Sequence, residues 1–279
     1  MRQQRHLWLP TLALSLGLCA ASSMAQAVQV DTELQLLMDV SGSVNSFEYG
    51  LQLQGYIDAF SSQSVQNAIL DTSDGKTGSI AVQMVMWSGA NQQASMTEWT
   101  LLDSVEAINN FTYSLANVIR PFYNMTAPGS ALLYGADQFV DNGFEGTRQV
   151  IDVSGDGMQN SGYDTSEARD AVLASGIDTI NGITIGQDYA GNDLQQWYAD
   201  NVIGGENAFV INAETFADFG TALEMKLAAE IDGTYIPETA LPAPIEDVPL
   251  GGQLGLLAAL LAWVWRRTAW EGAPQWAMA

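Results

Sequence analysis

Short apolar runs alternate with amphipathic segments along the chain from Val30 to Asp232. The apolar runs predict strands at Leu34–Asp39, Ile80–Trp87, Ala94–Trp99, Gln149–Ser154, Thr179–Ile185 and Ala208–Ile211. The amphipathic segments predict helices at Phe47–Ser62, Asp103–Val118, Ser130–Val140, Ser166–Ser175, Asp193–Asn201 and Phe216–Ile231. Nearly all-apolar strands separated by helices are typical of a mostly parallel sheet with both faces covered. We therefore expect an α/β fold with a doubly wound, mostly parallel central sheet and helices on both faces.

Residues 1–27 follow the pattern of a secretory signal peptide. Two arginines precede an apolar stretch, and Ala25-Gln-Ala27 offers the small residues of a cleavage site. A short membrane anchor is the alternative, and lipidation at Cys19 is a lesser one because a large Leu precedes that residue. The sequence thus predicts that a domain spanning residues 28–232 is exported.

The remainder of the chain divides into three segments. Residues 233–249 are Pro-rich and predict a linker. Residues 250–267 form an apolar stretch ending in an Arg pair, which predicts a transmembrane or sorting segment, and residues 268–279 form a tail. A buried C-terminal helix is the alternative for the apolar stretch. We expect the domain to be periplasmic or at the cell surface, anchored by this C-terminal segment.

The net charge of the chain is −23, and 31 of its 32 acidic residues lie between Val28 and Pro249. That stretch holds only five basic residues: Lys76, Arg120, Arg148, Arg169 and Lys226. Such a surface repels phosphate backbones, which excludes nucleic-acid binding. It attracts divalent cations and basic partners, although acidity also serves simply to keep a protein soluble.

His6 and Cys19 are the only His and Cys of the chain, and both lie in the predicted signal peptide. The mature domain would lack both residue types, which excludes a Ser-His-Asp triad, a Cys nucleophile, an ordinary zinc site and disulfides. Any metal would be bound by oxygen, and any hydrolysis would depend on carboxylates or a metal-activated water.

Candidate metal ligands follow two of the predicted strands. Asp39-Val-Ser-Gly-Ser43 places the carboxylate of Asp39 and the hydroxyls of Ser41 and Ser43 at one strand end, and Asp156 follows the strand Gln149–Ser154. In open α/β sheets, ligands bind at these carboxyl ends, where the strand order reverses. Oxygen ligands of this kind suit a hard cation such as Mg²⁺. The alternative is an Asp/Ser turn whose side chains bond their own backbone.

Three other polar features carry weaker signals. Asp71–Lys76 could be taken for a calcium loop, but it lacks the repeated oxygen ligands and closing Glu, so we interpret it as a turn. Asp152 lies inside a predicted strand, and we interpret it as a buried, hydrogen-bonded structural carboxylate. Ser154 is a weaker candidate ligand than the residues at the strand ends.

The spacing D-x-S-x-S at Asp39, followed by Thr126 in a later loop and by Asp156, resembles the metal-ion-dependent adhesion site of von Willebrand factor A domains. This resemblance implies that Ser41 and Ser43 bind the cation directly. It also implies that Asp39 and Asp156 bind directly or through waters, and that Thr126 completes the ring. One open position would then accept a Glu or Asp from a partner protein.

The resemblance extends beyond the site, over about Val30 to Asp232. The segments Gln149–Gly157, Ala168–Val172, Ile183–Ile185 and Trp197–Phe209 are similar to a bacterial family of secreted von Willebrand factor A-like proteins, catalogued as domain of unknown function 1194. The sequence therefore predicts an exported binding or adhesion module that holds an acidic group of a protein partner through Mg²⁺, with Mn²⁺ or Ca²⁺ as alternatives. The competing hypothesis is a metal-assisted hydrolase that uses Asp39 and a bound water, for which no suitable general base is evident.

Overall fold

The computed structural model describes residues 27–188, 191–233, 237 and 239–243. Its strands are β1 (Val28–Asp39), β2 (Ile80–Trp87), β3 (Gln93–Ser95), β4 (Thr100–Leu102), β5 (Phe144–Gly155), β6 (Thr179–Ile185), β7 (Gly204–Gly205), β8 (Phe209–Ala213) and β9 (Leu241–Pro242). Its helices are α1 (Ser46–Ser61), α2 (Gln63–Ile69), α3 (Val105–Leu115), α4 (Pro128–Asp137), α5 (Thr165–Ala174), α6 (Leu194–Asn201) and α7 (Phe219–Asp232), with a 3₁₀ turn at Ser73–Gly75.

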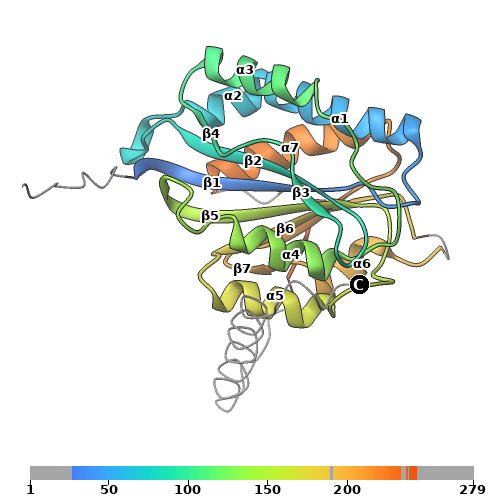
Figure 1. Cartoon of the computed structure of the whole chain (residues 1–279). Helices are drawn as coiled ribbons and strands as arrows, with labels where there is room; N and C mark the ends of the chain where they lie inside the picture. Colours follow the sequence, from blue (N-terminus) through green and yellow to red (C-terminus); the bar gives the residue numbers. More distant parts are fainter. Residues whose placement is uncertain (1–26, 189–190, 234–236, 238, 244–279) are drawn as a thin grey trace, which may run out of the picture.

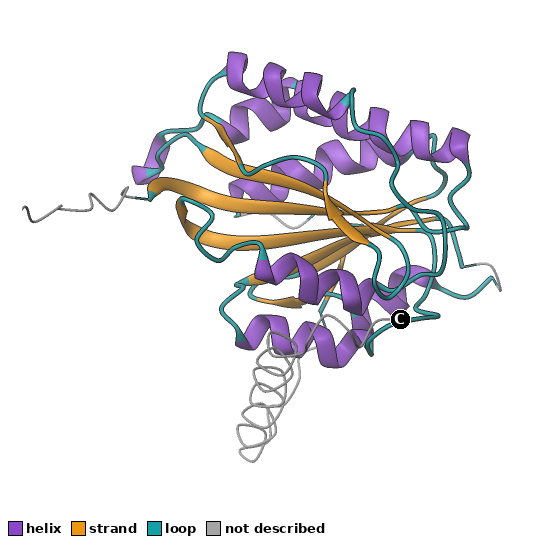
Figure 2. Ribbon diagram, in the orientation of Figure 1, coloured by secondary structure: helices purple, strands orange, loops and turns teal. Residues whose placement is uncertain are grey.

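One mixed sheet runs through the described chain in the order β3-β2-β1-β5-β6-β8-β9, with β4 beside β2 and β7 beside β6 (Figure 2). The strands β2, β1, β5, β6 and β8 pair in parallel. The short strands β3, β4, β7 and β9 are antiparallel to their neighbours. The doubly wound, mostly parallel α/β fold predicted from the sequence is therefore confirmed.

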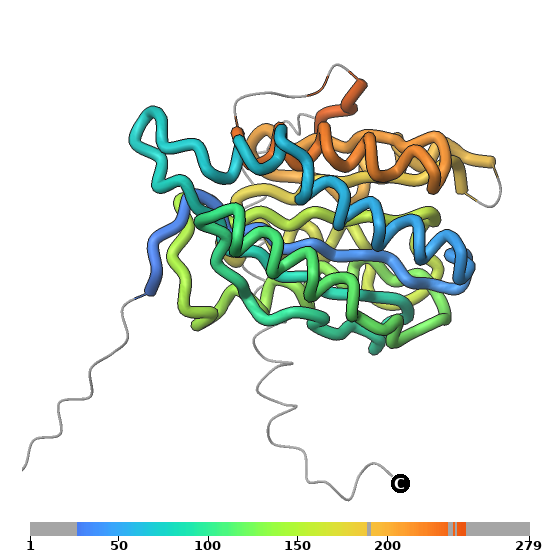
Figure 3. Tube along the Cα trace, turned by 90° about the horizontal axis from the view of Figure 1, so that it is seen from above, coloured from blue at the N-terminus to red at the C-terminus, as the bar shows by residue number. Residues whose placement is uncertain are grey.

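The helices cover the sheet in two layers (Figure 1). On one face lie α1, α2, α3 and α7, and Figure 3 shows α7, α1 and α3 side by side. On the other face lie α4, α5 and α6. Leu36 belongs to the apolar cluster under the first layer and Leu37 to the cluster under the second. Since successive strand residues point to opposite faces, a strand buried on both sides must be apolar at nearly every position.

The start of α1 is fixed by a reciprocal cap. The Asn45 side chain accepts the N–H groups of Phe47 and Glu48 at 2.8 and 3.1 Å, and the Glu48 carboxylate accepts the N–H of Asn45 at 2.8 Å. Such a capping box satisfies donors that the first helical turn cannot pair internally. The loop between Asp39 and Asn45 is thus held between the end of a central strand and a fixed helix start.

The short elements differ from the sequence-based expectation. The predicted strand Ala94–Trp99 is correct only at its start, because β3 ends at Ser95 and a separate β4 begins at Thr100, both antiparallel to β2. The short helix α2 was not predicted, and α7 begins at Phe219 rather than Phe216. Each of these elements is short or terminal, where the local pattern carries the least information.

Part of the segment predicted as a linker adds to the sheet. The backbone at Leu241 pairs with Val210 of β8, and the N–H of Ala243 donates to the carbonyl of Ala208 at 3.1 Å. Because β8 would otherwise be an edge of the sheet, this pairing covers its exposed backbone groups.

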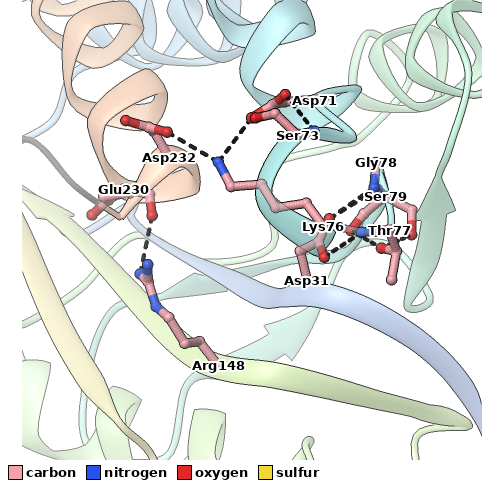
Figure 4. Close-up of polar contacts among 10 residues, drawn as sticks. All are labelled: Asp31, Asp71, Ser73, Lys76, Thr77, Gly78, Ser79, Arg148, Glu230 and Asp232. Atoms are coloured by element: carbon pink, nitrogen blue, oxygen red, sulfur yellow. Dashed lines mark hydrogen bonds and ion pairs between the residues drawn. The ribbon is translucent and has the colours of Figure 1, made fainter.

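The end of α7 lies away from the carboxyl ends of the strands and is tied to the loop before β2 and to strand β5 (Figure 4). The ammonium of Lys76 lies 3.0 Å from the carboxylates of both Asp71 and Asp232. Arg148 donates to the carbonyl of Glu230 at 3.0 Å, which satisfies a carbonyl of the last helical turn. Asp71 also accepts the N–H of Ser73, as expected of the turn predicted there.

Within the described residues, no helix combines the length and the apolar character that crossing a bilayer requires. The predicted apolar segment 250–267, the tail and residues 1–26 of the predicted signal peptide lie outside the described residues.

Candidate metal centre

The candidate site lies where the strand order reverses. β1 has β2 on one side and β5 on the other, so its carboxyl end faces loops that leave the sheet in opposite directions. Asp39 is the last residue of β1, and Asp156 directly follows β5. The register pairs Met38 with Ser154, which brings the two carboxylate-bearing ends beside each other. The topology thus joins residues that are more than a hundred positions apart in the sequence.

Three hydroxyls form a continuous hydrogen-bonded row that leads to Asp156. The Thr126 hydroxyl donates to Ser41 Oγ at 3.3 Å, and Ser41 Oγ lies 3.2 Å from Ser43 Oγ. Ser43 Oγ donates to Asp156 Oδ1 at 2.6 Å. The structure therefore brings together Ser41, Ser43, Thr126 and Asp156, as the predicted site requires.

Asp39 lies beneath this row with one oxygen paired and one not. Its Oδ1 accepts the N–H of Ser41 at 2.7 Å, whereas its Oδ2 is buried and has no hydrogen-bond partner. Burial raises the pKa of Asp39 to about 8, and the charge of Asp156 adds to this shift. A buried, unpartnered carboxylate oxygen is costly unless a proton or a cation neutralises it.

Asp156 lies closer to the surface, and its pKa is raised as well. Burial raises its pKa, the hydrogen bond from Ser43 lowers it, and the charge of Glu48 raises it again. Two neighbouring carboxylates whose protonated forms are both favoured would gain from a bound cation. The donor set consists of carboxylate and hydroxyl oxygens, which fits a hard divalent cation.

Carboxylates alone could not enclose such an ion. Among the described residues, no three Asp, Glu, His or Cys side chains gather around one point. The hydroxyls of Ser41, Ser43 and Thr126 would therefore have to supply the remaining protein ligands. A shell with few charged ligands leaves a divalent ion with net positive charge and able to take a further anionic ligand.

The sequence interpretation missed Arg120, which fixes two loops of the site. Its guanidinium donates to the carbonyls of Val40 and Ser41, both at 2.8 Å, and to that of Phe122 at 3.0 Å. It also lies 4.7 Å from the centre of the Tyr123 ring. Because the guanidinium is a rigid fork with several donors, one side chain can hold both loops in register.

The loop that carries Thr126 has its own supports. Asn160 accepts the N–H of Thr126 at 2.8 Å through Oδ1 and donates to its hydroxyl at 3.4 Å. The Gly42 N–H donates to the Asn124 carbonyl at 2.6 Å, and a Cβ at residue 42 would lie only 3.0 Å from that oxygen. Gly42 therefore allows the close approach of the two loops.

The residues beneath the site are structural. Ser154 donates to Gln52 at 3.1 Å and accepts from Tyr56 at 3.1 Å, and Gln52 donates to the carbonyl of Asp39 at 3.2 Å. Asp152 is fully buried, and its Oδ1 lies 2.6 Å from the ammonium of Lys226. Asp152 is thus a buried structural carboxylate, as we interpreted it from the sequence.

The fold is von Willebrand factor A-like, as comparison with solved structures shows. Proximal thread matrix protein 1 from the mussel byssus superimposes with a TM-score of 0.54 at 16% identity, over 73% of this chain and 49% of that one. The von Willebrand factor type A protein from Catenulispora acidiphila gives a TM-score of 0.51 at 14% identity, over 72% and 43%. The pilus adhesin SpaC from Lactobacillus rhamnosus GG gives 0.51 at 14% identity, over 74% and 31%.

The sequence profile of the family described as "Protein of unknown function (DUF1194)" matches residues 29–235. The chain belongs to this family. A search of curated proteins found no match. The chain spans about half the length of the mussel protein that it resembles in fold.

Proposed function

We propose that this protein is an exported binding module that holds an acidic group of a protein partner through a divalent cation, with Mg²⁺ as the first candidate and Mn²⁺ or Ca²⁺ as alternatives. The observation that carries the proposal is the unpartnered, buried Oδ2 of Asp39 beside a row of three hydroxyls. In addition, another structure of the mussel protein, with a TM-score of 0.51 and 16% identity, has zinc in its metal-ion-dependent adhesion site (MIDAS) motif.

Each of the five residues has a role in this proposal. Ser41 and Ser43 would bind the cation through their hydroxyls, with Thr126 on the facing loop. Asp39 and Asp156 would balance its charge, directly or through waters. The bound cation would supply a positive centre that still accepts one carboxylate from outside, and a Glu or Asp of a partner protein has the matching charge.

Binding rather than hydrolysis fits the side chains around the site. The described residues contain no His, and Asp39, the carboxylate of the site whose pKa is raised to about 8, is fully buried. A general base must reach the proton that it removes, directly or through one water. A buried carboxylate that already accepts a backbone N–H is better suited to hold a cation.

Export and anchoring are part of the same proposal. Residues 1–27 have the features of a signal peptide, and residues 250–267 those of a transmembrane or sorting segment. The site would then face the periplasm or the cell exterior. Protease added to spheroplasts should digest the domain, whereas protection until lysis would contradict export.

Calorimetric titration with Mg²⁺ tests the metal site. The wild-type protein should bind about one ion, and Ser43→Ala and Asp156→Asn should each weaken binding by about tenfold or more. Ser61→Ala and Asp58→Asn make the same chemical changes on exposed positions of α1 and should leave the affinity unchanged. Unchanged Mg²⁺ binding in Asp39→Ala, with the fold retained, would remove the central claim.

Partner binding needs a separate test. Envelope extracts passed over the immobilised protein with Mg²⁺ should yield a partner that EDTA elutes and that the Ser43→Ala protein does not retain. Turnover of phosphoester or peptide substrates that depends on both Mg²⁺ and Asp39 would instead support the hydrolase.

A further inference from the structure

A groove with a volume of about 750 Å³ opens beside the candidate metal centre. Ser43, Thr126 and Asp156 form part of its wall, so the groove is continuous with the site. The rest is built from the first turns of α1, the loop after β5, and the ends of β6 and β8. A partner whose carboxylate reached the cation would therefore also contact this groove.

Its walls include large apolar side chains at the surface. Phe47 is 74% exposed on the first turn of α1, and it lines the groove together with Leu51 and Phe216. Covering a Phe ring that lies mostly in water lowers the free energy, and aromatic side chains are common in protein contact surfaces. The groove is thus shaped for an apolar side chain as well as a charged one.

The charge of the groove is entirely negative. None of its lining residues is Lys or Arg, and four are acidic: Glu48, Asp156, Asp188 and Glu214. Of the five basic side chains in the described part of the chain, Lys76 and Arg148 lie at the far end of α7 (Figure 4), Lys226 is buried, and Arg169 is paired with Asp170. The charge of Arg120 does act on Asp156, but its guanidinium is bonded to the carbonyls of Val40 and Ser41 and is not part of the groove wall. Glu214, which is exposed directly after β8, therefore has no Lys or Arg among the residues that line the groove with it.

The metal centre and the groove would attract groups of opposite charge on the same ligand. The cation would attract a carboxylate, whereas the groove repels a second one and attracts a positive charge. We propose that the groove binds a segment of a partner protein that places a Lys or Arg and an apolar side chain beside the carboxylate bound to the metal. This inference rests on the proposed function, because the metal sets where the carboxylate lies.

Synthetic peptides provide a direct test with the full-length protein. Three peptides share a central Glu and a Phe two residues away, and differ only in flanking residues: two Lys, two Gln or two Glu. With excess Mg²⁺ at about 0.15 M salt, the Lys peptide should bind about tenfold more tightly than the Gln peptide. The Glu peptide should bind most weakly, and the differences should shrink at high salt.

A charge reversal in the groove tests whether the groove itself, rather than the overall negative charge of the protein, favours the Lys peptide. Glu214→Lys should reduce the ratio of the affinities for the Lys and Gln peptides by about threefold or more. Glu145→Lys makes the same change at an exposed position at the opposite end of the sheet and should preserve it. The Mg²⁺ affinity of each variant is measured in parallel, so that a damaged metal site is recognised.

The outcomes distinguish this inference from the proposed function. Equal affinities for the three peptides, all lost in EDTA, would contradict the proposed role of the groove and still support the metal-dependent contact. Binding of the Lys peptide that persists in EDTA and responds to Glu214→Lys would support the groove and remove the metal-dependent contact. Failure of every peptide to bind a protein that does bind Mg²⁺ would overturn the groove as a ligand surface.

Discussion

The hydroxyl of Tyr198 and the Oδ2 oxygen of Asp39 are both buried, both without a hydrogen-bond partner, and both packed against Gly155. A Cβ atom at residue 155 would collide with the two of them. The charge of Asp39 also acts on the Tyr198 hydroxyl, whose pKa burial already raises well above its usual value. An α6 side chain thus reaches under the candidate metal centre from the opposite layer of helices.

We expect Tyr198→Phe to weaken Mg²⁺ binding by about threefold to tenfold without destabilising the metal-free protein. The hydroxyl and the open oxygen of Asp39 both lie against Gly155, so the hydroxyl can orient that carboxylate when an ion binds. In the metal-free state its removal eliminates an unsatisfied buried group. Calorimetry and thermal unfolding in EDTA measure the two effects, and Tyr134→Phe on α4 is the control. A loss of stability with unchanged affinity would contradict this role.

Arg120→Lys should weaken Mg²⁺ binding by about tenfold, because an outer residue that orients ligands is typically worth that much. An ammonium cannot reproduce the bonds from one guanidinium to the carbonyls of Val40, Ser41 and Phe122. Amide exchange in residues 40–44 and 120–126 should also become faster. The control is Arg169→Lys on α5, where Nη1 donates to the Asp200 carbonyl. If Mg²⁺ affinity and amide exchange are unchanged in the Arg120 variant, the two loops keep their positions without the guanidinium.

The strand-end carboxylates could be predicted because each follows a buried apolar run. Asp39 ends β1 and Asp156 follows β5, and a parallel sheet aligns such ends at one edge. Thr126 was different: no local pattern marks it, and only the resemblance to von Willebrand factor A domains indicated it. Its position against Ser41 depends on how two loops pack, which is a tertiary property.

Arg120 and Tyr198 could not be predicted, since each acts through a long-range contact from a segment whose own pattern is ordinary. Lys226 did carry a signal. It is the single basic residue of an otherwise apolar stretch of α7, four positions before Glu230, and a charge pair at that spacing shares one face of a helix. Leu223 and Leu227 lie on the same buried stripe, so the pair had to be buried as well.

Lys226→Met should lower the free energy of unfolding by about 3 to 5 kcal/mol. The Lys226 ammonium contacts both Asp152 and Glu230, and all three side chains are fully buried. Without it, two carboxylates would share an apolar site with no compensating charge. Urea unfolding measures the loss, and Lys76→Met, which breaks two partly exposed ion pairs, should cost clearly less. Equal losses in the two variants would contradict the importance of burial.

The last prediction concerns pH and the same cluster. Burial raises the pKa of Glu230 from 4.5 to about 7, the charge of Asp152 adds to the shift, and Lys226 opposes it. Between these two pH values the folded protein retains a proton that the unfolded chain has released. The free energy of unfolding should therefore fall as pH rises from 4.5 to 7, by at most about 1.4 kcal/mol per pH unit. Urea unfolding in EDTA across this range should give a shallower slope for Glu230→Gln than for the wild type. Glu224→Gln, on the same helix, should keep the wild-type slope, and identical slopes in all three proteins would show that Glu230 is ionised throughout.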